Sequence, residues 1–288
     1  MANRIFKIAV TDYCNMNCIY CRSKRQIIKD KPMEKLFSDE EILRLIRMAG
    51  KAGFNTVHIT GGEPMVRPGM VRLLERIRDY PRVEKLILST NGSLMTEGVR
   101  EEVNQYIDEI HVSIDAMQAF DFANICGMSQ CMNEIFQCVW TACAAGIQTR
   151  ITCMLIENAR PHIPVLGDLG KKMDFDICFK ELAKGSYESG VIPLDADEVL
   201  DILGKRYGSL EKTSSEDPLI DYYRTSALKS RIGIVHTNRE RSDMVYLAPD
   251  GVLYCGKRMR RMIDLKLKLE NGASYDDFAC CFEEQPDE

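Results

Sequence analysis

Short apolar segments alternate with amphipathic helical patterns from the start of this 288-residue chain to about residue 190. This alternation predicts a parallel sheet, because parallel neighbours need a long, usually helical, crossover connection. Six strand–helix units fit the pattern, so the expected fold is α/β, a partial (β/α)6 barrel of the TIM type. A capping box at residues 38–41 opens one helix. We expect strands at 6–11, 56–60, 85–89, 109–114, 150–157 and 176–181, and further helices at 70–78, 133–145 and 163–173.

The regular order changes after residue 190. Residues 195–207 have a helical pattern, and 232–235, 244–248 and 252–255 have the pattern of short strands. Asp250-Gly251 between the last two strands is a strong hairpin-turn signal. We therefore expect residues 1–190 to form the barrel and residues 191–288 to form a small C-terminal extension that packs on its open side.

Composition limits the classes of protein that this chain can belong to. Its 45% hydrophobic content is enough for one large core, and its apolar runs are too short to span a membrane. Twelve cysteines without a secretory signal favour metal chemistry in a reducing compartment over a disulfide framework. A formal net charge of −5 argues against an extended nucleic-acid partner. We expect a cytoplasmic, oxygen-sensitive protein.

Three cysteines follow the first expected strand at a C-x₃-C-x₂-C spacing: Cys14, Cys18 and Cys21, with Tyr20 just before the last. A cubane iron–sulfur cluster normally takes one thiolate per iron, so three cysteines leave one iron open to another ligand. A structural zinc site would need a fourth ligand, and no histidine lies nearby. Burial as unpaired core cysteines is the other alternative, which the polar loop disfavours. The spacing thus favours a cluster that does chemistry.

Further polar motifs follow the next three expected strands, where α/β sheets and barrels build active sites. They are Gly61-Gly62-Glu63, Thr90-Asn91 and Ser113. Ordinary capping of strand ends is the alternative explanation for Thr90, Asn91 and Ser113. In this order, and together with the cysteine triplet, the motifs resemble those of the radical S-adenosylmethionine (SAM) superfamily.

The resemblance implies one [4Fe–4S] cluster whose open iron binds SAM. It also implies reductive cleavage of SAM to a 5′-deoxyadenosyl radical, with an electron donor such as flavodoxin or ferredoxin. The radical would then abstract hydrogen from a small-molecule substrate. The implied metal ligands are Cys14, Cys18 and Cys21, and the implied SAM-binding residues are Tyr20, Gly61, Gly62, Glu63, Thr90, Asn91 and Ser113.

Over nearly its whole length the chain is most similar to the GTP-cyclising radical SAM enzymes of molybdenum cofactor biosynthesis. Phe179-Lys180-Glu181-Leu182 and the segment from Leu247 to Gly251 contribute to this resemblance. The family's second cluster uses a C-x₂-C pair, but residues 236–243 contain no cysteine, and the family's C-terminal double glycine is missing. We therefore expect a single cluster and a reaction other than GTP cyclisation. The alternative is a second site made by Cys255, Cys280 and Cys281.

Candidate substrate residues are fewer. Lys180 and Glu181 end the sixth strand, and one of them is expected to meet a polar substrate, unless they pair with each other. Lys257, Arg258 and Arg260 are expected to neutralise a substrate anion, unless they form a solvated surface. The favoured substrate is a nucleotide, nucleoside or sugar, in cofactor or natural-product biosynthesis. A peptide-modifying radical SAM maturase and a non-catalytic iron–sulfur or SAM sensor are the alternatives.

Overall fold

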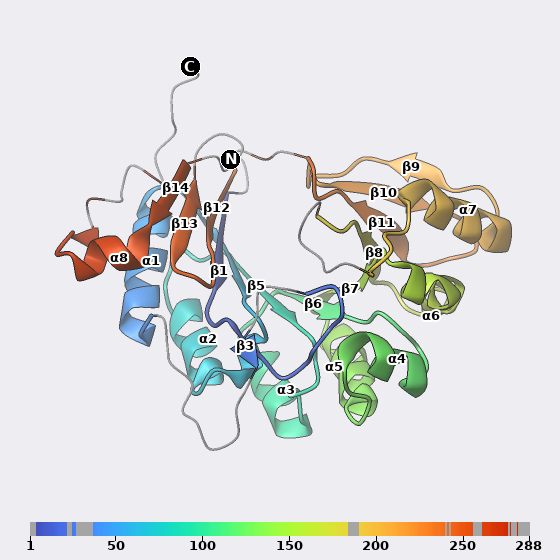
Figure 1. Ribbon diagram of the computed structural model, residues 1–288, viewed down its shortest axis with the longest axis horizontal. Helices are drawn as coiled ribbons and strands as arrows, with labels where there is room; N and C mark the ends of the chain where they lie inside the picture. The colour runs from blue at the N-terminus through green and yellow to red at the C-terminus, as the bar shows by residue number, and fades with distance from the viewer. Residues whose placement is uncertain are drawn as a thin grey trace.

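The computed structural model describes residues 4–21, 25–26, 37–183, 190–239, 241, 243–255, 261–275, 277 and 281. Six parallel strands form the centre of one twelve-stranded sheet (Figure 1). This parallel centre, with helices between its strands, confirms the expected α/β fold. The strands are, in spatial order, β1 (Ile5–Ala9), β4 (Thr56–Thr60), β5 (Lys85–Thr90), β6 (Glu109–Ser113), β7 (Gln148–Met154) and β8 (Asp176–Lys180).

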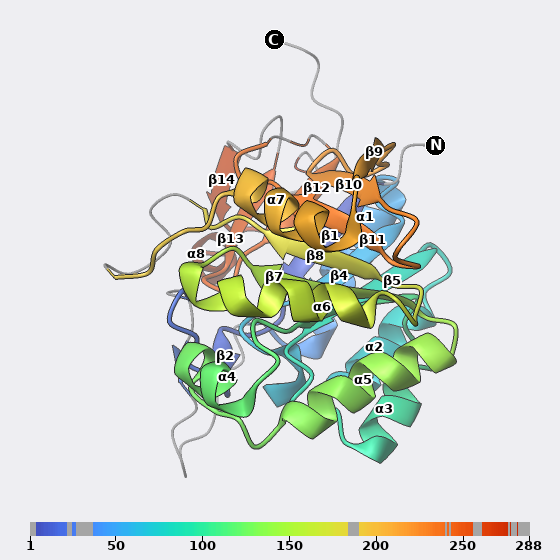
Figure 2. The ribbon, with the colours of Figure 1, turned by 90° about the vertical axis from the view of Figure 1, so that its right-hand side faces the viewer.

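Helices connect these strands and cover one face of the sheet, as Figure 2 shows for the helices between β5 and β8. The predicted capping box is confirmed, since Ser38 Oγ accepts from the backbone of Glu41 and the Glu41 carboxylate accepts from the backbone of Ser38. The helices are α1 (Asp39–Lys51), α2 (Met70–Arg78), α3 (Glu97–Val103), α4 (Ala119–Cys126), α5 (Met132–Ala144) and α6 (Ile163–Leu169), with 3₁₀ turns η1 (Pro64–Val66) and η2 (Glu157–His162).

Two expected elements end three or more residues earlier than their apolar patterns. The strand expected to reach residue 157 ends at Met154, because Glu157 begins η2 and forms an ion pair with Arg160 at 2.7 Å. The helix expected to reach residue 173 ends at Leu169. Gly170 follows it at a close contact, where an added Cβ would lie 2.7 Å from the Cβ of Ser230. A local ion pair thus accompanies the end of the strand, and a close contact with a residue distant in sequence accompanies the end of the helix.

The chain beyond residue 190 lengthens the sheet at both edges, and the predicted hairpin at Asp250-Gly251 joins two antiparallel strands. The boundary at residue 190 stays a prediction, because strands on both sides of it share this sheet. Next to β8 lie β11 (Arg231–Val235), β10 (Ile220–Arg224) and β9 (Glu211–Thr213); next to β1 lie β12 (Met244–Leu247), β13 (Val252–Cys255) and β14 (Arg261–Asp264); α7 (Ala196–Tyr207) and α8 (Leu265–Glu270) accompany them.

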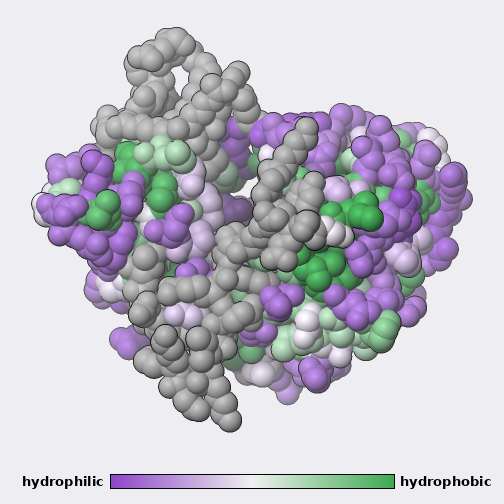
Figure 3. All heavy atoms as spheres, in the orientation of Figure 1, coloured by the Kyte–Doolittle hydropathy of each residue, from purple (hydrophilic) through white to green (hydrophobic). Residues whose placement is uncertain are grey.

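The outer surface has no broad apolar area on the face drawn in Figure 3, where hydrophobic side chains form small groups among hydrophilic ones. Among the described residues, large exposed hydrophobic side chains such as Phe120 on α4, Ile192 in the loop before α7 and Met262 on β14 lie on separate segments. No helix in the described part of the chain is long and apolar enough to cross a membrane.

Candidate active site

The cysteine loop leaves the carboxyl end of β1 and is held by the end of α4. Cys14, in the short strand β2 (Tyr13–Cys14), is buried, whereas Cys21 is exposed. The backbone N–H of Met16 donates to Cys14 Sγ at 3.4 Å. The N–H groups of Asn17 and Ile19 donate to the carbonyls of Cys126 and Ile125, both at 2.9 Å. The middle of the loop is therefore tied to α4 by two backbone hydrogen bonds.

The donor set of this loop fits an iron–sulfur cluster by its chemistry. Cys14, Cys18 and Cys21 supply three thiol sulfurs, and thiolates are the normal ligands of such clusters. Among the described residues, however, no three His, Cys, Asp or Glu side chains are grouped closely enough to hold a metal ion. Metal binding often organises a site that is not preformed, so we expect the thiols to converge when the cluster is inserted.

The Gly61-Gly62 turn packs directly against the backbone that leads into the cysteine loop. The N–H of Gly62 donates to the carbonyl of Thr11, and the N–H of Glu63 donates to the carbonyl of Tyr13, both at 2.8 Å. An added Cβ would lie 2.4 Å from Thr11 O at Gly61 and 2.2 Å from Tyr13 O at Gly62. Only glycine fits at these two positions, and the turn and the cysteine loop thus form one unit.

Glu63 connects this turn to the end of β5. Its buried carboxylate accepts from the Thr90 hydroxyl at 2.7 Å, the Asn91 N–H at 2.6 Å and the Met65 N–H at 3.0 Å. Burial raises the pKa of Glu63, and these three hydrogen bonds oppose the rise. A carboxylate has about four acceptor sites, so one remains for a further donor such as an ammonium group.

The other expected SAM-binding side chains have different surroundings. Thr90 and Asn91 do cap their own turn, since their side-chain oxygens accept from the N–H groups of Gly92 and Ser93, both at 3.0 Å. Asn91 also donates to Asn15 of the cysteine loop at 3.0 Å. Ser113 is exposed, and its hydroxyl makes no hydrogen bond within the described ranges. Local capping and contact with the cysteine loop therefore occur together.

Tyr20 has a partner that the cysteine motif does not reveal. Its hydroxyl donates to Asp115 at 2.5 Å, just beyond the end of β6. Burial and the nearby Asp115 carboxylate raise the pKa of Tyr20, and burial raises the pKa of Asp115. The signal in the sequence was an acidic residue within the apolar stretch Ile114-Asp115-Ala116.

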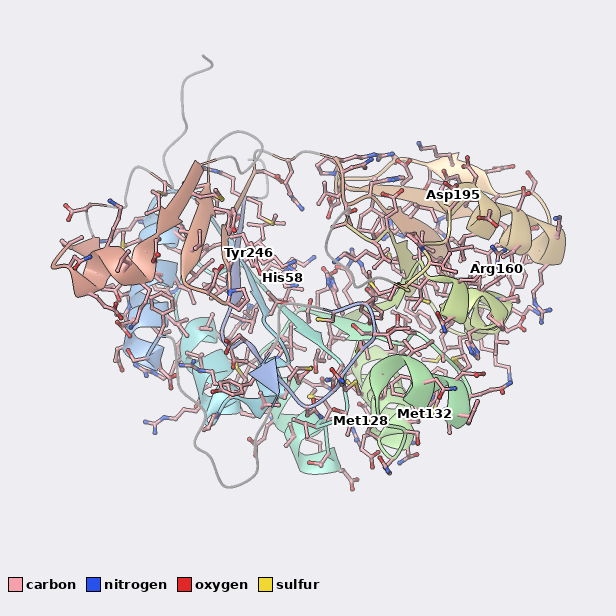
Figure 4. The ribbon with its side chains drawn as sticks, in the orientation of Figure 1. His58, Met128, Met132, Arg160, Asp195 and Tyr246 are labelled. Carbon is pink, nitrogen blue, oxygen red and sulfur yellow. The ribbon has the colours of Figure 1, made fainter. Side chains whose placement is uncertain are left out.

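The face of the sheet turned away from the helices, here called the inner face, carries several cations. Strand register places Tyr246, Lys7 and His58 in one row across β12, β1 and β4. Figure 4 shows His58 and Tyr246 near the middle of the molecule, beside β1. Burial, with the neighbouring Lys180 and Arg241, lowers the pKa of Lys7 to about 7. Within the described ranges the Lys7 ammonium has a ring contact, 5.8 Å from the Tyr246 centroid, but no ion pair.

Arg150 and Lys180 extend the basic character of the inner face across β7 and β8. Arg150 donates to the Tyr222 hydroxyl at 3.1 Å and lies 3.4 Å from Glu109, while its buried Nε has no partner within the described ranges. Burial lowers the pKa of Lys180, and Cys21 of the cysteine loop opposes this effect. No ion pair to Lys180 occurs among the described residues. Lys7, Arg150 and Lys180 are called the inner-face cations below.

The structure separates Lys180 from Glu181. The Glu181 carboxylate lies 2.9 Å from His236 Nδ1 and accepts from the Thr237 N–H at 3.3 Å. Successive residues of a strand point to opposite faces, so Glu181 turns away when Lys180 points inward. The alternative in which these two side chains pair with each other is therefore not observed.

The remaining candidates lie mostly in the C-terminal part. Cys255 and Cys281 are buried in the structure. The other candidates lie outside the described residues: Lys257, Arg258, Arg260 and Cys280.

Comparison with known proteins agrees with this arrangement of fold and motifs. A sequence profile described as the Radical SAM superfamily matches residues 8–164, more than half of the chain. This protein therefore belongs to the radical SAM superfamily. It is a radical SAM enzyme, and its cofactors are a [4Fe–4S] cluster and SAM.

Two of the similar proteins are described as GTP 3′,8-cyclases. The chain is 27% identical over 280 residues to the GTP 3′,8-cyclase of Clostridium perfringens (strain SM101 / Type A), which covers 93% of this chain and 84% of the relative. It is 24% identical over 281 residues to the GTP 3′,8-cyclase of Thermodesulfovibrio yellowstonii, covering 94% of this chain and 87% of the relative.

Two solved structures share the fold. The structure of native anSMEcpe with bound AdoMet has a TM-score of 0.60 and 14% identity, over 96% of this chain and 88% of that one. Streptococcus suis SuiB has a TM-score of 0.61 and 15% identity, over 86% of this chain and 59% of that one. At these identities the likeness concerns the fold alone.

Proposed function

We propose that this radical SAM enzyme abstracts hydrogen from a small anionic substrate of the nucleotide class. The observation that carries the proposal is the set of inner-face cations, because Lys7 and Lys180 have no ion pair within the described ranges. A buried charge is costly unless it is paired, and a bound phosphate or carboxylate would supply the partner. The description of the relatives as GTP 3′,8-cyclases also supports a nucleotide.

The proposal does not extend to cyclisation of GTP. Residues 236–243 contain no cysteine, and His236 lies instead between the carboxylates of Glu181 and Asp221, at 2.9 and 3.3 Å. A carboxylate–histidine–carboxylate arrangement supplies charge and hydrogen bonds rather than thiolate ligands. We therefore propose one cluster per chain and a different outcome after hydrogen abstraction.

When bound, the cluster and SAM together supply reductive cleavage of SAM to a 5′-deoxyadenosyl radical. The chain itself would hold and orient these groups. Cys14, Cys18 and Cys21 would ligate the cluster, and the Gly61–Gly62 turn with Glu63 would accept the SAM ammonium. The open hydroxyl of Ser113 is suited to the SAM ribose, and Tyr20, Thr90 and Asn91 would complete the SAM-binding set.

The inner-face cations would have a separate task. They lie on β1, β7 and β8, whereas the SAM-binding set lies at the carboxyl ends of β4, β5 and β6 and on the cysteine loop. A substrate anion held by Lys7 and Lys180 would place the rest of the substrate toward the radical. Orientation of this kind can supply a large part of a rate enhancement. A flavodoxin or ferredoxin is the proposed electron donor.

The test is anaerobic reconstitution followed by iron counting and an assay of dithionite-driven 5′-deoxyadenosine formation. We expect about four irons per chain, and loss of both iron and SAM cleavage in the Cys14→Ala, Cys18→Ala, Cys21→Ala triple variant. GTP, GMP and guanosine are then added in parallel, and the phosphorylated compounds should stimulate cleavage more than guanosine does. About eight irons would contradict the single cluster, and stimulation by guanosine equal to that by GTP would contradict the anion site.

A further inference from the structure

Asp115 joins three separate elements beside the cysteine loop. Its side chain is 1% exposed. One carboxylate oxygen accepts from the Tyr20 hydroxyl at 2.5 Å and lies 3.8 Å from the Cys126 thiol. The other oxygen accepts from the backbone N–H of Met154 at 2.7 Å. The three donors belong to the cysteine loop, the end of α4 and the end of β7 respectively.

The same end of α4 also holds the backbone on both sides of Cys18. The N–H groups of Asn17 and Ile19 donate to carbonyls of α4, each at 2.9 Å. Gly127, with φ of +81°, ends α4 so close to the loop that an added Cβ would lie 3.2 Å from the Cβ of Asn17. The backbone on both sides of Cys18 is therefore held by contacts that depend on the position of α4.

The third donor, the N–H of Met154, links Asp115 and the cysteine loop to the strands β7 and β8. Met154 is the last residue of β7 and is the register partner of Lys180 on β8. Through Met154, Asp115 connects the cysteine loop to the strands that carry two of the inner-face cations. An acceptor that is fully buried and bonded to three elements fixes their relative positions, because each lost bond would leave a buried polar group unsatisfied.

We propose that Asp115 is a positioning residue of the cysteine loop, acting through Tyr20 and Cys126. By this inference it sets how firmly the cluster ligands are held and how well SAM is bound, and it contributes little to the chemical step. The inference deepens the proposed function and rests on it. Because Asp115 acts here through protein groups, its effect should appear in SAM binding and in the accessibility of the cysteine loop.

The experiment compares Tyr20→Phe and Asp115→Asn with Tyr207→Phe. Tyr207 is a matched control, since its buried hydroxyl donates to Asp168 at 2.9 Å between α6 and α7, away from the cysteine loop. The readouts are the KM for SAM and the kcat for SAM cleavage, the rate of iron loss to a chelator, and the rate at which iodoacetamide alkylates Cys18 in the iron-free protein.

For Tyr20→Phe and Asp115→Asn we expect a KM for SAM and a rate of iron loss about tenfold higher, with kcat changed by less than about twofold. Alkylation of Cys18 should be faster by a similar factor, and Tyr207→Phe should match the unmodified protein. If Asp115→Asn does not fold, Tyr20→Phe decides, because it removes a single oxygen atom.

Two results would overturn the inference. One is a Tyr20→Phe protein whose KM, iron loss and alkylation rate all stay within about twofold of the unmodified protein. The other is a Tyr20→Phe protein in which only the melting temperature falls, by as much as in Tyr207→Phe. That result is the signature of a purely structural hydrogen bond. Failure of the unmodified protein to bind iron would instead contradict the proposed function, while the alkylation readout would still test the loop.

Discussion

Two regions of the sheet differ in how their charged side chains are paired: the rim, formed by the carboxyl ends of β4, β5 and β6, and the inner face. On the rim, Glu63 and Asp115 are buried acids, and each accepts hydrogen bonds from three groups of the protein. On the inner face, Lys7 and Lys180 are cations without an ion pair in the described part of the chain. The two buried acids of the rim are thus largely satisfied by the protein itself, whereas Lys7 and Lys180 on the inner face lack a counter-ion among the described residues. This difference indicates a preorganised scaffold next to a site for an anion.

The largest expected effect comes from removing the Glu63 carboxylate from the rim. Glu63→Ala leaves the Thr90 hydroxyl and the N–H groups of Met65 and Asn91 without their acceptor, so we expect a loss of about 3 kcal/mol in the free energy of unfolding. Misplacement of the turn should also lower SAM cleavage by about 100-fold. Urea unfolding and the 5′-deoxyadenosine assay measure the two effects. Glu198→Ala, which removes an exposed partner of Arg160, is the control and should cost under about 1 kcal/mol.

An effect of intermediate size is expected from substitutions on the inner face, and here the free energy of unfolding should not fall. Lys180→Met and Lys7→Met remove cations that lack counter-ions, so the free energy of unfolding should stay constant or rise by about 1 kcal/mol. At the same time the KM for a phosphorylated nucleotide should rise about tenfold. Lys171→Met removes an exposed lysine paired with Asp168 at 2.7 Å and should leave that KM unchanged. A marked loss of stability in Lys180→Met would show that the inner face is already satisfied.

The smallest expected effect is a pH dependence that originates on the inner face. Burial, together with Lys7 and other cations, holds the pKa of His58 well below its ordinary value of 6.5, and burial lowers the pKa of His111 to about 4. The unfolded chain therefore binds more protons than the folded one as pH falls below 6.5, and stability is lost in that range.

Urea unfolding at pH 7 and pH 5 measures this dependence in the unmodified protein and in His58→Gln. Glutamine can keep a hydrogen bond to Ser89, which lies 2.7 Å from His58 Nε2. We expect the variant to lose less stability between the two pH values. Equal losses would assign the acid sensitivity to groups outside the inner face.

Local patterns were sufficient for the six central strands and for the class of enzyme, but they did not predict other elements such as α4 (Ala119–Cys126) and β10 (Ile220–Arg224). Apolar periodicity located the six central strands, and the capping box at Ser38 and the hairpin at Asp250-Gly251 were both confirmed. The cysteine triplet and the Gly61-Gly62-Glu63 turn identified the superfamily, because the chemistry of each motif depends on residues a few positions apart in the sequence. Where boundaries were wrong by three or more residues, at 157 and 173, a local ion pair and a close contact with Ser230 respectively accompany the earlier end.

The roles of individual charged side chains could not be predicted from such local patterns. Lys180 and Glu181 are adjacent in the chain, yet one faces Met154 in the sheet register and the other lies against His236, because a strand alternates its faces. Asp115 appears in the sequence as an isolated acid within an apolar stretch. Its three donors are up to 95 residues away, and only the folded chain brings them together.

The amino-acid sequence by itself therefore determined the cofactor chemistry and the α/β architecture, because both are encoded over short spacings. The tertiary structure decided which charges share the inner face and which buried acid holds the cysteine loop. Strand order and register set these pairings, and burial gives them their energetic weight, since an unpaired polar group costs far more inside the protein than in water.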